Sequence, residues 1–292
     1  MRTIELGDTR LTYVVDGAMA FAPAYFFPTV PRDVWTAGSL LDAGGMVPMT
    51  AGGLLVEKSG RRLLVDAGLG LVENSRAEGA ANSGSLPDTL ALLGLDPADI
   101  DVLALTHLHL DHVGWAARRD GDGPYRKTFA NARYVVAAAE WAAYPPGGGT
   151  QPLPVAADAL ESFKDALELV EDGDEVFPGV HAIVTPGHSP GHTSYAIDTG
   201  AERIIAFGDA FHHPVQLAHP EWGSGPDSDS DAVPAARERL IGELTRPGTF
   251  AFATHFGDQV FGRVTTGDGG RAAWTPVPST VLSPHPRPLD RT

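Results

Sequence analysis

The prediction of the fold starts from one stretch of the sequence, Thr106-His107-Leu108-His109-Leu110-Asp111-His112. It contains four candidate metal ligands within six residues. The stretch follows Asp101–Thr106, a short apolar run that favours a buried strand. In an extended chain His107 and His109 have the same parity, so their side chains can project to one side. Burying three histidines and a carboxylate without partners would be costly. The stretch therefore predicts a metal site at the end of a strand.

Three other stretches supply candidate ligands, and each follows a predicted strand. They are Thr185-Pro186-Gly187-His188-Ser189-Pro190-Gly191-His192, Phe207-Gly208-Asp209-Ala210 and Ala253-Thr254-His255-Phe256-Gly257. Each alone is weak, since a single histidine after a strand is more often structural than a ligand. Together with the first stretch they form the ordered pattern HxHxDH, H, D and H, which is highly specific.

The chain contains no cysteine among its 292 residues. This excludes disulfides, iron–sulfur clusters, thiolate nucleophiles and cysteine-based zinc sites. Any metal ion must therefore be held by imidazole nitrogen and carboxylate oxygen. Such a set of donors suits zinc and is also compatible with manganese, iron or cobalt.

The net charge of -16 limits the partners of the chain. It argues against nucleic acid, because phosphate binding relies on Lys and Arg, and it favours a neutral small-molecule substrate over a polyanion. The first residues are polar and lack the basic-then-apolar order of a secretory signal. The apolar stretch 18–30 is interrupted by Pro23 and Pro28 and is too short to span a bilayer. We therefore expect a cytoplasmic protein without a membrane partner.

The rest of the pattern indicates a mixed α/β protein, in which short apolar strands alternate with helices after two hairpins. The expected elements are the hairpins Thr3–Leu6 with Leu11–Asp16 and Gly53–Glu57 with Arg61–Val65, the strands Asp101–Thr106, Ala132–Val136, His181–Thr185, Thr193–Asp198, Arg203–Phe207 and Thr249–Ala253, and the helices Pro87–Leu93 and Val233–Thr245. No linker divides two cores, so we expect a single domain over residues 1–280 and a flexible tail over 281–292.

Two segments are less regular. The polar stretch 72–85 is rich in Gly, Ala, Asn and Ser and is expected to be a loop. The apolar stretch 18–31 is punctuated by prolines and matches neither strand alternation nor helical spacing. It is either a buried segment that wraps around the core or a wall of the substrate pocket.

The ordered ligand pattern resembles the metallo-β-lactamase superfamily, and within it the branch of N-acyl-homoserine lactonases and methyl-parathion-hydrolase-type enzymes. The resemblance covers the chain from about Thr50 to Gly257. It implies an αββα sandwich, in which two mixed β-sheets are flanked by helices and the metals lie at one edge of the sheets. Relatives are often dimers, so a homodimer is compatible with the resemblance.

The resemblance also implies two divalent metal ions per chain, with zinc as the expected metal. By this resemblance the first ion is held by His107, His109 and His192, the second by Asp111, His112 and His255, and Asp209 bridges both. Asp66 matches a position that braces the site from behind. His188, four residues before His192, is expected to stabilise its loop rather than to bind metal.

A two-metal site lowers the pKa of bound water from ~15.7 to about 7. The resulting bridging hydroxide can attack a carbonyl group while a metal stabilises the oxyanion. We expect hydrolysis of a lactone or ester, N-acyl-homoserine lactones included, with Asp111 and His212 as catalytic residues. His212 departs from the lactonase pattern, in which a tyrosine lies three residues after the bridging aspartate. It could donate a hydrogen bond to the substrate or leaving group, or brace the site.

Three other functions fit parts of the pattern. A histidine at position 212 resembles the parathion-hydrolase-like members, which favours phosphotriester or arylester hydrolysis. Thioester hydrolysis of the glyoxalase II type is the second, although no basic cluster for the glutathione carboxylates can be identified. The third is a binding protein that keeps its metals for stability. The full ligand set argues against it, because inactive relatives of enzymes usually lose ligands.

Overall fold

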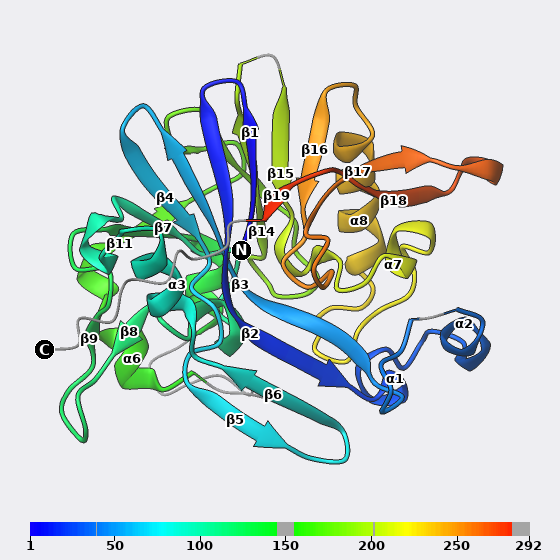
Figure 1. Ribbon diagram of the computed structural model, residues 1–292, viewed down its shortest axis with the longest axis horizontal. Helices are drawn as coiled ribbons and strands as arrows, with labels where there is room; N and C mark the ends of the chain where they lie inside the picture. The colour runs from blue at the N-terminus through cyan, green and yellow to red at the C-terminus, as the bar shows by residue number, and fades with distance from the viewer. Residues whose placement is uncertain (39, 145–154, 201, 282–292) are drawn as a thin grey trace, which may run out of the picture.

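Two mixed β-sheets form the centre of the computed structural model, which describes residues 1–38, 40–144, 155–200 and 202–281 (Figure 1). In the first sheet the strands lie in the order β11 (Leu167–Val170), β10 (Arg133–Ala137), β7 (Val102–Ala104), β4 (Arg61–Val65), β3 (Val47–Lys58), β2 (Thr9–Phe21), β1 (Arg2–Leu6) and β19 (Thr280–Val281). In the second the order is β12 (Glu175–Phe177), β13 (Val180–Val184), β14 (Thr193–Asp198), β15 (Arg203–Ala206), β16 (Thr249–Phe252), β17 (Phe261–Thr266) and β18 (Ala272–Pro276).

The remaining elements lie at the edges and on the outer faces of the sheets. The short strands are β5 (Val72–Ser75), β6 (Gly79–Ser83), β8 (Ala117–Arg118) and β9 (Arg126–Lys127). The α-helices are α1 (Pro23–Phe26), α2 (Arg32–Thr36), α3 (Leu86–Leu92), α4 (Leu110–Val113), α5 (Ala138–Ala143), α6 (Ala157–Glu161), α7 (Val215–Ala218) and α8 (Val233–Leu244). The 3-10 turns are η1 (Pro97–Asp99), η2 (Lys164–Ala166), η3 (Gly208–Ala210) and η4 (Asp268–Gly270).

Apolar side chains from both sheets meet in one buried cluster between them. The cluster includes Leu11, Leu54, Leu63 and Val102 of the first sheet and Val180, Ile197, Ile204 and Phe252 of the second. Removing apolar surface from water stabilises a fold by ~25 cal/mol per Å². This layer is therefore a main source of the stability of the sandwich.

The outer face of each sheet is covered by helices. Successive strand residues point to opposite faces, so Leu55 and Leu64 face away from the central layer. They join a second buried cluster, to which α3 contributes Leu90. On the second sheet Ile205 packs in a cluster with Leu240 of α8. The layers are thus helix, sheet, sheet and helix, and the predicted αββα architecture is confirmed.

Strands β2 and β3 are longer than the sequence predicted. The predicted strands were Leu11–Asp16 and Gly53–Glu57, whereas the paired strands span Thr9–Phe21 and Val47–Lys58. An irregularity in the register between Val15 and Gly17 lets β2 continue past the predicted end. The extended part of β2 then pairs with β6.

The prediction of a loop over residues 72–85 was wrong in part, because β5 and β6 form a hairpin there. Its residues are small or polar because the hairpin lies at the edge of the fold and is largely exposed (Figure 1). The apolar stretch 18–31 contains regular elements, although its sequence matches neither strand alternation nor helical spacing. It begins as the end of β2 and continues into α1, and Phe27 behind α1 is fully buried beside Trp35 of α2.

The strand ends bring the polar segments together. Strands β4 and β7 are parallel neighbours, as are β15 and β16, so the carboxyl ends within each pair lie at the same edge of a sheet. Asp66 follows β4, and the histidines of 107–112 follow β7. Asp209 follows β15 and His255 follows β16. The fold therefore gathers candidate ligands from both sheets.

Within the described ranges, no helix is long and apolar enough to cross a membrane. Of the tail expected over 281–292, Val281 closes β19, and the remaining residues lie outside the part that the structure describes. The single domain over residues 1–280 stays a prediction.

Candidate metal centre

Two groups of side chains in the structure have ligand atoms close enough to hold a metal ion. The first group consists of His107, His109, His188 and Asp209, and the second of Asp111, His112, Asp209 and His255. Within each group the ligand atoms lie within 4.8 Å of one another. Six of the seven predicted ligands fall in these groups, and His192 is the exception.

Asp209 belongs to both groups, and its two carboxylate oxygens face different ones. Oδ1 lies 3.0 Å from Nε2 of His112 and 2.9 Å from Nε2 of His255. Oδ2 lies 3.3 Å from Nε2 of His188 and 3.7 Å from Nε2 of His107. The carboxylate is therefore oriented as a bridge between the two groups.

His107 and His109 of the first group are neutral imidazoles. Burial lowers the pKa of His107, and it lowers the pKa of His109 to about 3. A neutral ring keeps the lone pair that a metal ion requires. Nδ1 of His109 lies 2.9 Å from Nε2 of His188, which is the separation of a hydrogen bond between the two rings.

The second group is the more open one. Three of its members are fully buried, but the side chain of Asp111 is 20% exposed. Oδ2 of Asp111 lies 3.7 Å from Nε2 of His112 and 3.8 Å from Nε2 of His255. Solvent therefore reaches this group on the side of Asp111.

Asp66 holds the second group from behind. Its Oδ2 lies 2.8 Å from Nδ1 of His112, and its Oδ1 accepts the backbone N–H of Thr106 at 2.8 Å. Nδ1 of His255 donates to the backbone oxygen of Thr50 at 2.7 Å. Because Nδ1 of each histidine is engaged, Nε2 is the atom that faces Asp209. The arrangement agrees with the bracing position that the resemblance implied for Asp66.

Asp227 has the corresponding position behind the first group. Its Oδ1 lies 2.9 Å from Nδ1 of His188. Burial acts to lower the pKa of His188, but the carboxylates of Asp209 and Asp227 outweigh it and raise that pKa to about 9. Sequence reasoning missed Asp227, because the acidic stretch around it is typical of a solvated loop.

His192 lies outside the two groups, and its role as a metal ligand stays a prediction. Its Nε2 accepts the backbone N–H of Asp209 at 2.9 Å, and its Nδ1 lies 2.8 Å from Oγ1 of Thr185. Both ring nitrogens thus lie within hydrogen-bond distance of protein groups, as both ring nitrogens of His188 also do. His188, expected only to stabilise its loop, contributes a ring nitrogen to the first group instead.

His212 lies beside the first group and is fully buried. Its Nε2 is 3.0 Å from Oδ2 of Asp209, and its backbone N–H donates to Oε1 of Gln216 at 2.8 Å. Burial lowers the pKa of the ring, so the imidazole is neutral. Phe26 of α1 packs edge-on against it, with 5.2 Å between ring centroids.

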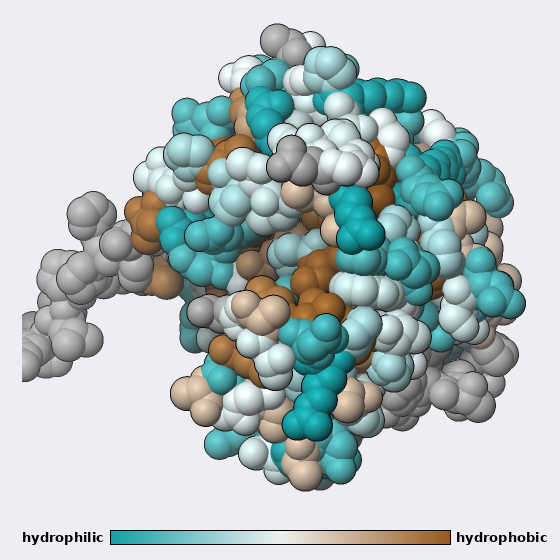
Figure 2. All heavy atoms as spheres, turned by 90° about the vertical axis from the view of Figure 1, so that its right-hand side faces the viewer, coloured by the Kyte–Doolittle hydropathy of each residue, from teal (hydrophilic) through white to brown (hydrophobic). Residues whose placement is uncertain are grey.

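Phe26 links this part of the site to an apolar cluster formed around α2. The cluster contains Phe27, Val30, Trp35 and Val47, with Val215 of α7 and Trp222 packed against it. Figure 2 views the side of the molecule that carries α2 and α7, and hydrophobic side chains gather near the middle of this face, edged by hydrophilic ones. Part of the stretch 18–31 is therefore a wall beside His212.

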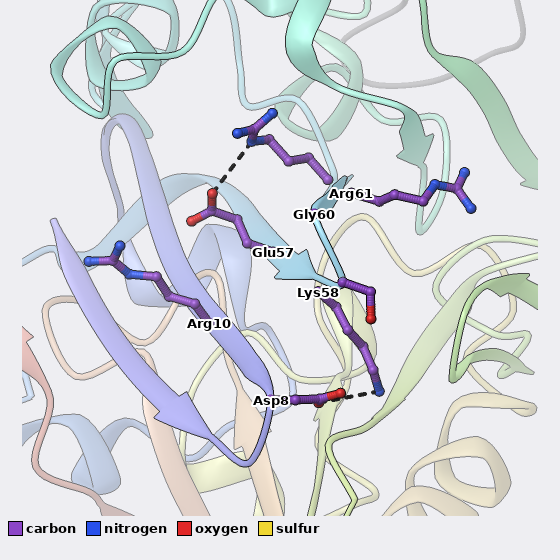
Figure 3. A pocket seen from close by; sticks show the side chains of 8 residues that line it. Asp8, Arg10, Glu57, Lys58, Gly60 and Arg61 are labelled. Atoms are coloured by element: carbon purple, nitrogen blue, oxygen red, sulfur yellow. Dashed lines mark hydrogen bonds and ion pairs between the residues drawn. The ribbon is translucent and has the colours of Figure 1, made fainter.

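A surface pocket of about 310 Å³ lies elsewhere, on the tips of the β1–β2 and β3–β4 hairpins (Figure 3). It is lined by Lys58 at the end of β3, whereas Thr50 near the start of that strand contacts His255. The charges in the pocket pair with one another, Lys58 with Asp8 and Arg62 with Glu57. The pocket is therefore separate from the two groups.

The two groups fit metal ions. In the part of the chain that the structure describes, Nε2 of His107, His112 and His255 and Oδ1 of Asp209 are buried without a hydrogen-bond partner. An unpaired buried polar atom costs ~1–3 kcal/mol, and a cation in each group would satisfy these atoms. The donors are nitrogen and oxygen alone, which suits zinc and is compatible with manganese, iron or cobalt.

Comparison with known proteins agrees with this geometry. The chain is 28% identical over 208 residues to an N-acyl homoserine lactonase of Bacillus cereus, which covers 64% of this chain and 74% of that protein. It is 31% identical over 121 residues to the N-acyl homoserine lactonase AttM of Agrobacterium fabrum, covering 38% of this chain and 40% of that one.

Solved structures share the fold. The dizinc quorum-quenching lactonase AidC superimposes with a TM-score of 0.80 at 22% identity, covering 96% of this chain and 98% of its own. The hydrolase AbOPH of the β-lactamase superfamily superimposes with a TM-score of 0.78 at 24% identity, covering 94% and 96%.

The family model that matches the sequence is that of the metallo-β-lactamase superfamily, over residues 53–255. This range includes the parallel pairs β4–β7 and β15–β16 and every member of the two groups. Because the match covers more than half of the chain, this protein belongs to the metallo-β-lactamase superfamily.

Proposed function

We propose that this protein is a metal-dependent hydrolase that opens a lactone or ester with two divalent ions, N-acyl-homoserine lactones being the leading candidates. The observation that carries the proposal is Asp209, whose two oxygens face two separate ligand groups. Bound there, two ions would lower the pKa of a coordinated water and polarise the substrate carbonyl. The names of the curated relatives support the lactone.

The grouping of the ligand atoms favours His188 over the predicted His192 at one position. His107, His109 and His188 would hold the first ion, Asp111, His112 and His255 would hold the second, and Asp209 would serve both. His192 is the alternative to His188, and in this structure its Nε2 accepts the backbone N–H of Asp209. Zinc is the proposed metal, because the ligands are mainly imidazole.

Asp111 and His212 are the proposed catalytic residues. Asp111 is the ligand that solvent reaches, so its carboxylate can accept a proton from water and return it to the leaving oxygen. His212 lies against Oδ2 of Asp209 and beside Phe26, at the boundary between the ligands and an apolar wall. The contact uses the single N–H of the neutral imidazole, so His212 would donate this proton to a substrate only on releasing Asp209.

The apolar wall suits an uncharged acyl chain. Phe26 stacks on Phe21 of β2 with 4.7 Å between ring centroids, and both border the cluster of Met19, Met49 and Leu69. The net charge of -16 disfavours polyanionic substrates.

One feature favours a second candidate function. His212 replaces the tyrosine of the lactonase pattern, so phosphotriester or arylester hydrolysis belongs in the test.

A substrate panel with metal analysis of the same sample tests the proposal. We expect two ions per chain and hydrolysis of lactones ahead of an aryl ester, a thioester and a phosphotriester. Asp209→Ala should lower activity by more than about 100-fold, because even groups behind metal ligands contribute ~10–100-fold. Glu161→Gln is the matched control, since Glu161 is exposed on α6 and pairs with Lys164.

Two results would contradict the proposal. Full activity after removal of the metals by a chelator excludes metal-dependent hydrolysis. A protein that holds two ions but is inert on the whole panel favours a binding function instead.

A further inference from the structure

Glu140 of α5 is a buried carboxylate that belongs to neither ligand group. It is fully buried, although acidic side chains rarely are unless they are paired. No motif marks it in the sequence, where it lies in Ala137-Ala138-Ala139-Glu140-Trp141. Its burial therefore needs a structural explanation.

The hydrogen bonds of Glu140 join two loops that carry ligands of the first group. Oε1 accepts the backbone N–H of Leu108 at 2.9 Å. Oε2 accepts the backbone N–H of Gly191 at 2.9 Å and the hydroxyl of Ser189 at 2.6 Å. Leu108 lies between His107 and His109, and Ser189 directly follows His188. One carboxylate thus holds both loops of the first group.

The packing at Gly191 makes this connection short and rigid. A Cβ atom at this position would lie 2.1 Å from the backbone nitrogen of Glu140 and 2.6 Å from its Cα. The loop therefore touches the backbone of α5 directly, and a side chain would push it away. Together with the hydrogen bonds, this contact fixes how far the loop of His188 lies from that of His109.

The second group has no share in this connection. The side-chain hydrogen bonds of Glu140 to described residues end on Leu108, Ser189 and Gly191. His112 is instead held by Asp66, and His255 by the backbone of Thr50. A change at Glu140 should therefore act on one half of the site.

We propose that Glu140 is a positioning residue that sets the affinity of the first group for its ion, by holding the loop of His109 against the loop that carries His188 and His192. The proposal rests on the proposed function in one respect, namely that each group binds an ion. Groups that orient metal ligands typically contribute ~10–100-fold to metal affinity. No side-chain hydrogen bond of Glu140 to a described residue reaches the second group, so the first ion should lose more affinity than the second.

Zinc titration of the metal-free protein, in competition with a chromophoric chelator, tests the proposal in a graded series. Glu140→Ala removes all three hydrogen bonds and should weaken one of the two ions by ~10–100-fold. Glu140→Gln keeps the size but turns one acceptor into a donor, so at least one backbone N–H loses its partner and the effect is intermediate. Ser189→Ala removes one bond and should have the smallest effect.

Reference variants identify which ion is weakened. His188→Ala removes a ligand of the first group and His255→Ala one of the second. The visible absorption of bound cobalt in the Glu140 variants should shift toward that of His188→Ala. Asp16→Asn is the matched control, because Asp16 is equally buried and accepts N–H bonds from Leu69, Gly70, Leu86 and Trp115 but from neither ligand loop.

Asp16→Asn should lower the melting temperature without changing the ratio of the two affinities. The proposal is overturned if Glu140→Gln folds and binds both ions as tightly as the wild type, or if it weakens both ions equally. If Glu140→Ala does not fold, Glu140→Gln and Ser189→Ala decide the matter. A wild-type protein that binds a single ion contradicts the two-ion function itself, which is a separate result from an unaffected Glu140 variant.

Discussion

The two halves of the metal centre share Asp209 but are supported by different parts of the molecule. The second group is supported from the first sheet, by Asp66 at the end of β4 and by the backbone of Thr50 in β3. The first group is supported by Asp227 in a loop and by Glu140 in a short helix, and it reaches Asp66 only through Thr106, whose Oγ1 lies 3.0 Å from Nδ1 of His107. One half thus depends on the sandwich itself, and the other on carboxylates that tie loops together.

The largest expected effect concerns which of His188 and His192 binds the first ion. If His192 were the ligand, the first group would not be the one described above. His188→Ala should lose one ion and lower activity by more than about 100-fold, because a ligand contributes more than the groups behind it. His192→Ala should keep both ions and lose about 10-fold in activity, since it only orients Asp209. Metal analysis and kinetics of both variants provide the measurement. Loss of an ion from the His192 variant alone would restore the sequence prediction.

Asp66 and Asp227 test whether the two groups are supported separately. Asp66→Asn should weaken mainly the ion of the second group and Asp227→Asn that of the first, each by ~10–100-fold, because Asp66 contacts His112 directly and Asp227 contacts His188. Competitive zinc titration of both variants, read against His255→Ala and His188→Ala, checks the assignment. If both variants weaken the same ion, the halves are not supported independently.

The smallest expected effect is on the free energy of unfolding at acid pH. Measured on the metal-free protein, it is distinct from the release of ions by acid. His213 belongs to neither group and packs on Trp35, and burial lowers its pKa to about 4. Above pH 6.5 the ring is neutral in both states, so its contribution to stability is complete. As the pH falls from 6.5 to 4, the unfolded chain binds a proton that the native chain does not, and stability declines by up to ~1.4 kcal/mol per pH unit.

Urea unfolding of the metal-free protein across this pH range measures the decline. His213→Leu should make the slope shallower than in the wild type, whatever its effect on stability at pH 7. Equal slopes in the two proteins would show that His213 does not carry the acid sensitivity.

The strand ends of the site were predictable, because each ligand segment follows a short apolar run in the sequence. The strand Thr193–Asp198 and the start of the helix at Val233 agree with the structure. The hairpin β5–β6 was not recognised, because its strands are exposed and bury too little to show apolar alternation. Pairing with the extended end of β2, which lies far away in the sequence, decides its structure.

The resemblance to a family, and not the local sequence, chose His192 over His188. The segment contains Pro-Gly-His twice, so the two histidines have the same local context. What separates them is tertiary, namely the backbone N–H of Asp209 that engages His192 and the carboxylate of Asp227 that engages His188. Glu140 was missed for a similar reason, since its partners lie 32 and 51 residues away.

The position of Asp209 has a thermodynamic consequence. With an ion in each group, as we propose, a single carboxylate that contacts both would make the two binding equilibria interdependent, since an ion on one oxygen changes the charge and orientation that the other oxygen presents. By linkage, whatever factor the first ion imposes on the affinity for the second is imposed equally in the reverse direction. A centre built around a shared oxygen pair is therefore a cooperative unit rather than two adjacent sites.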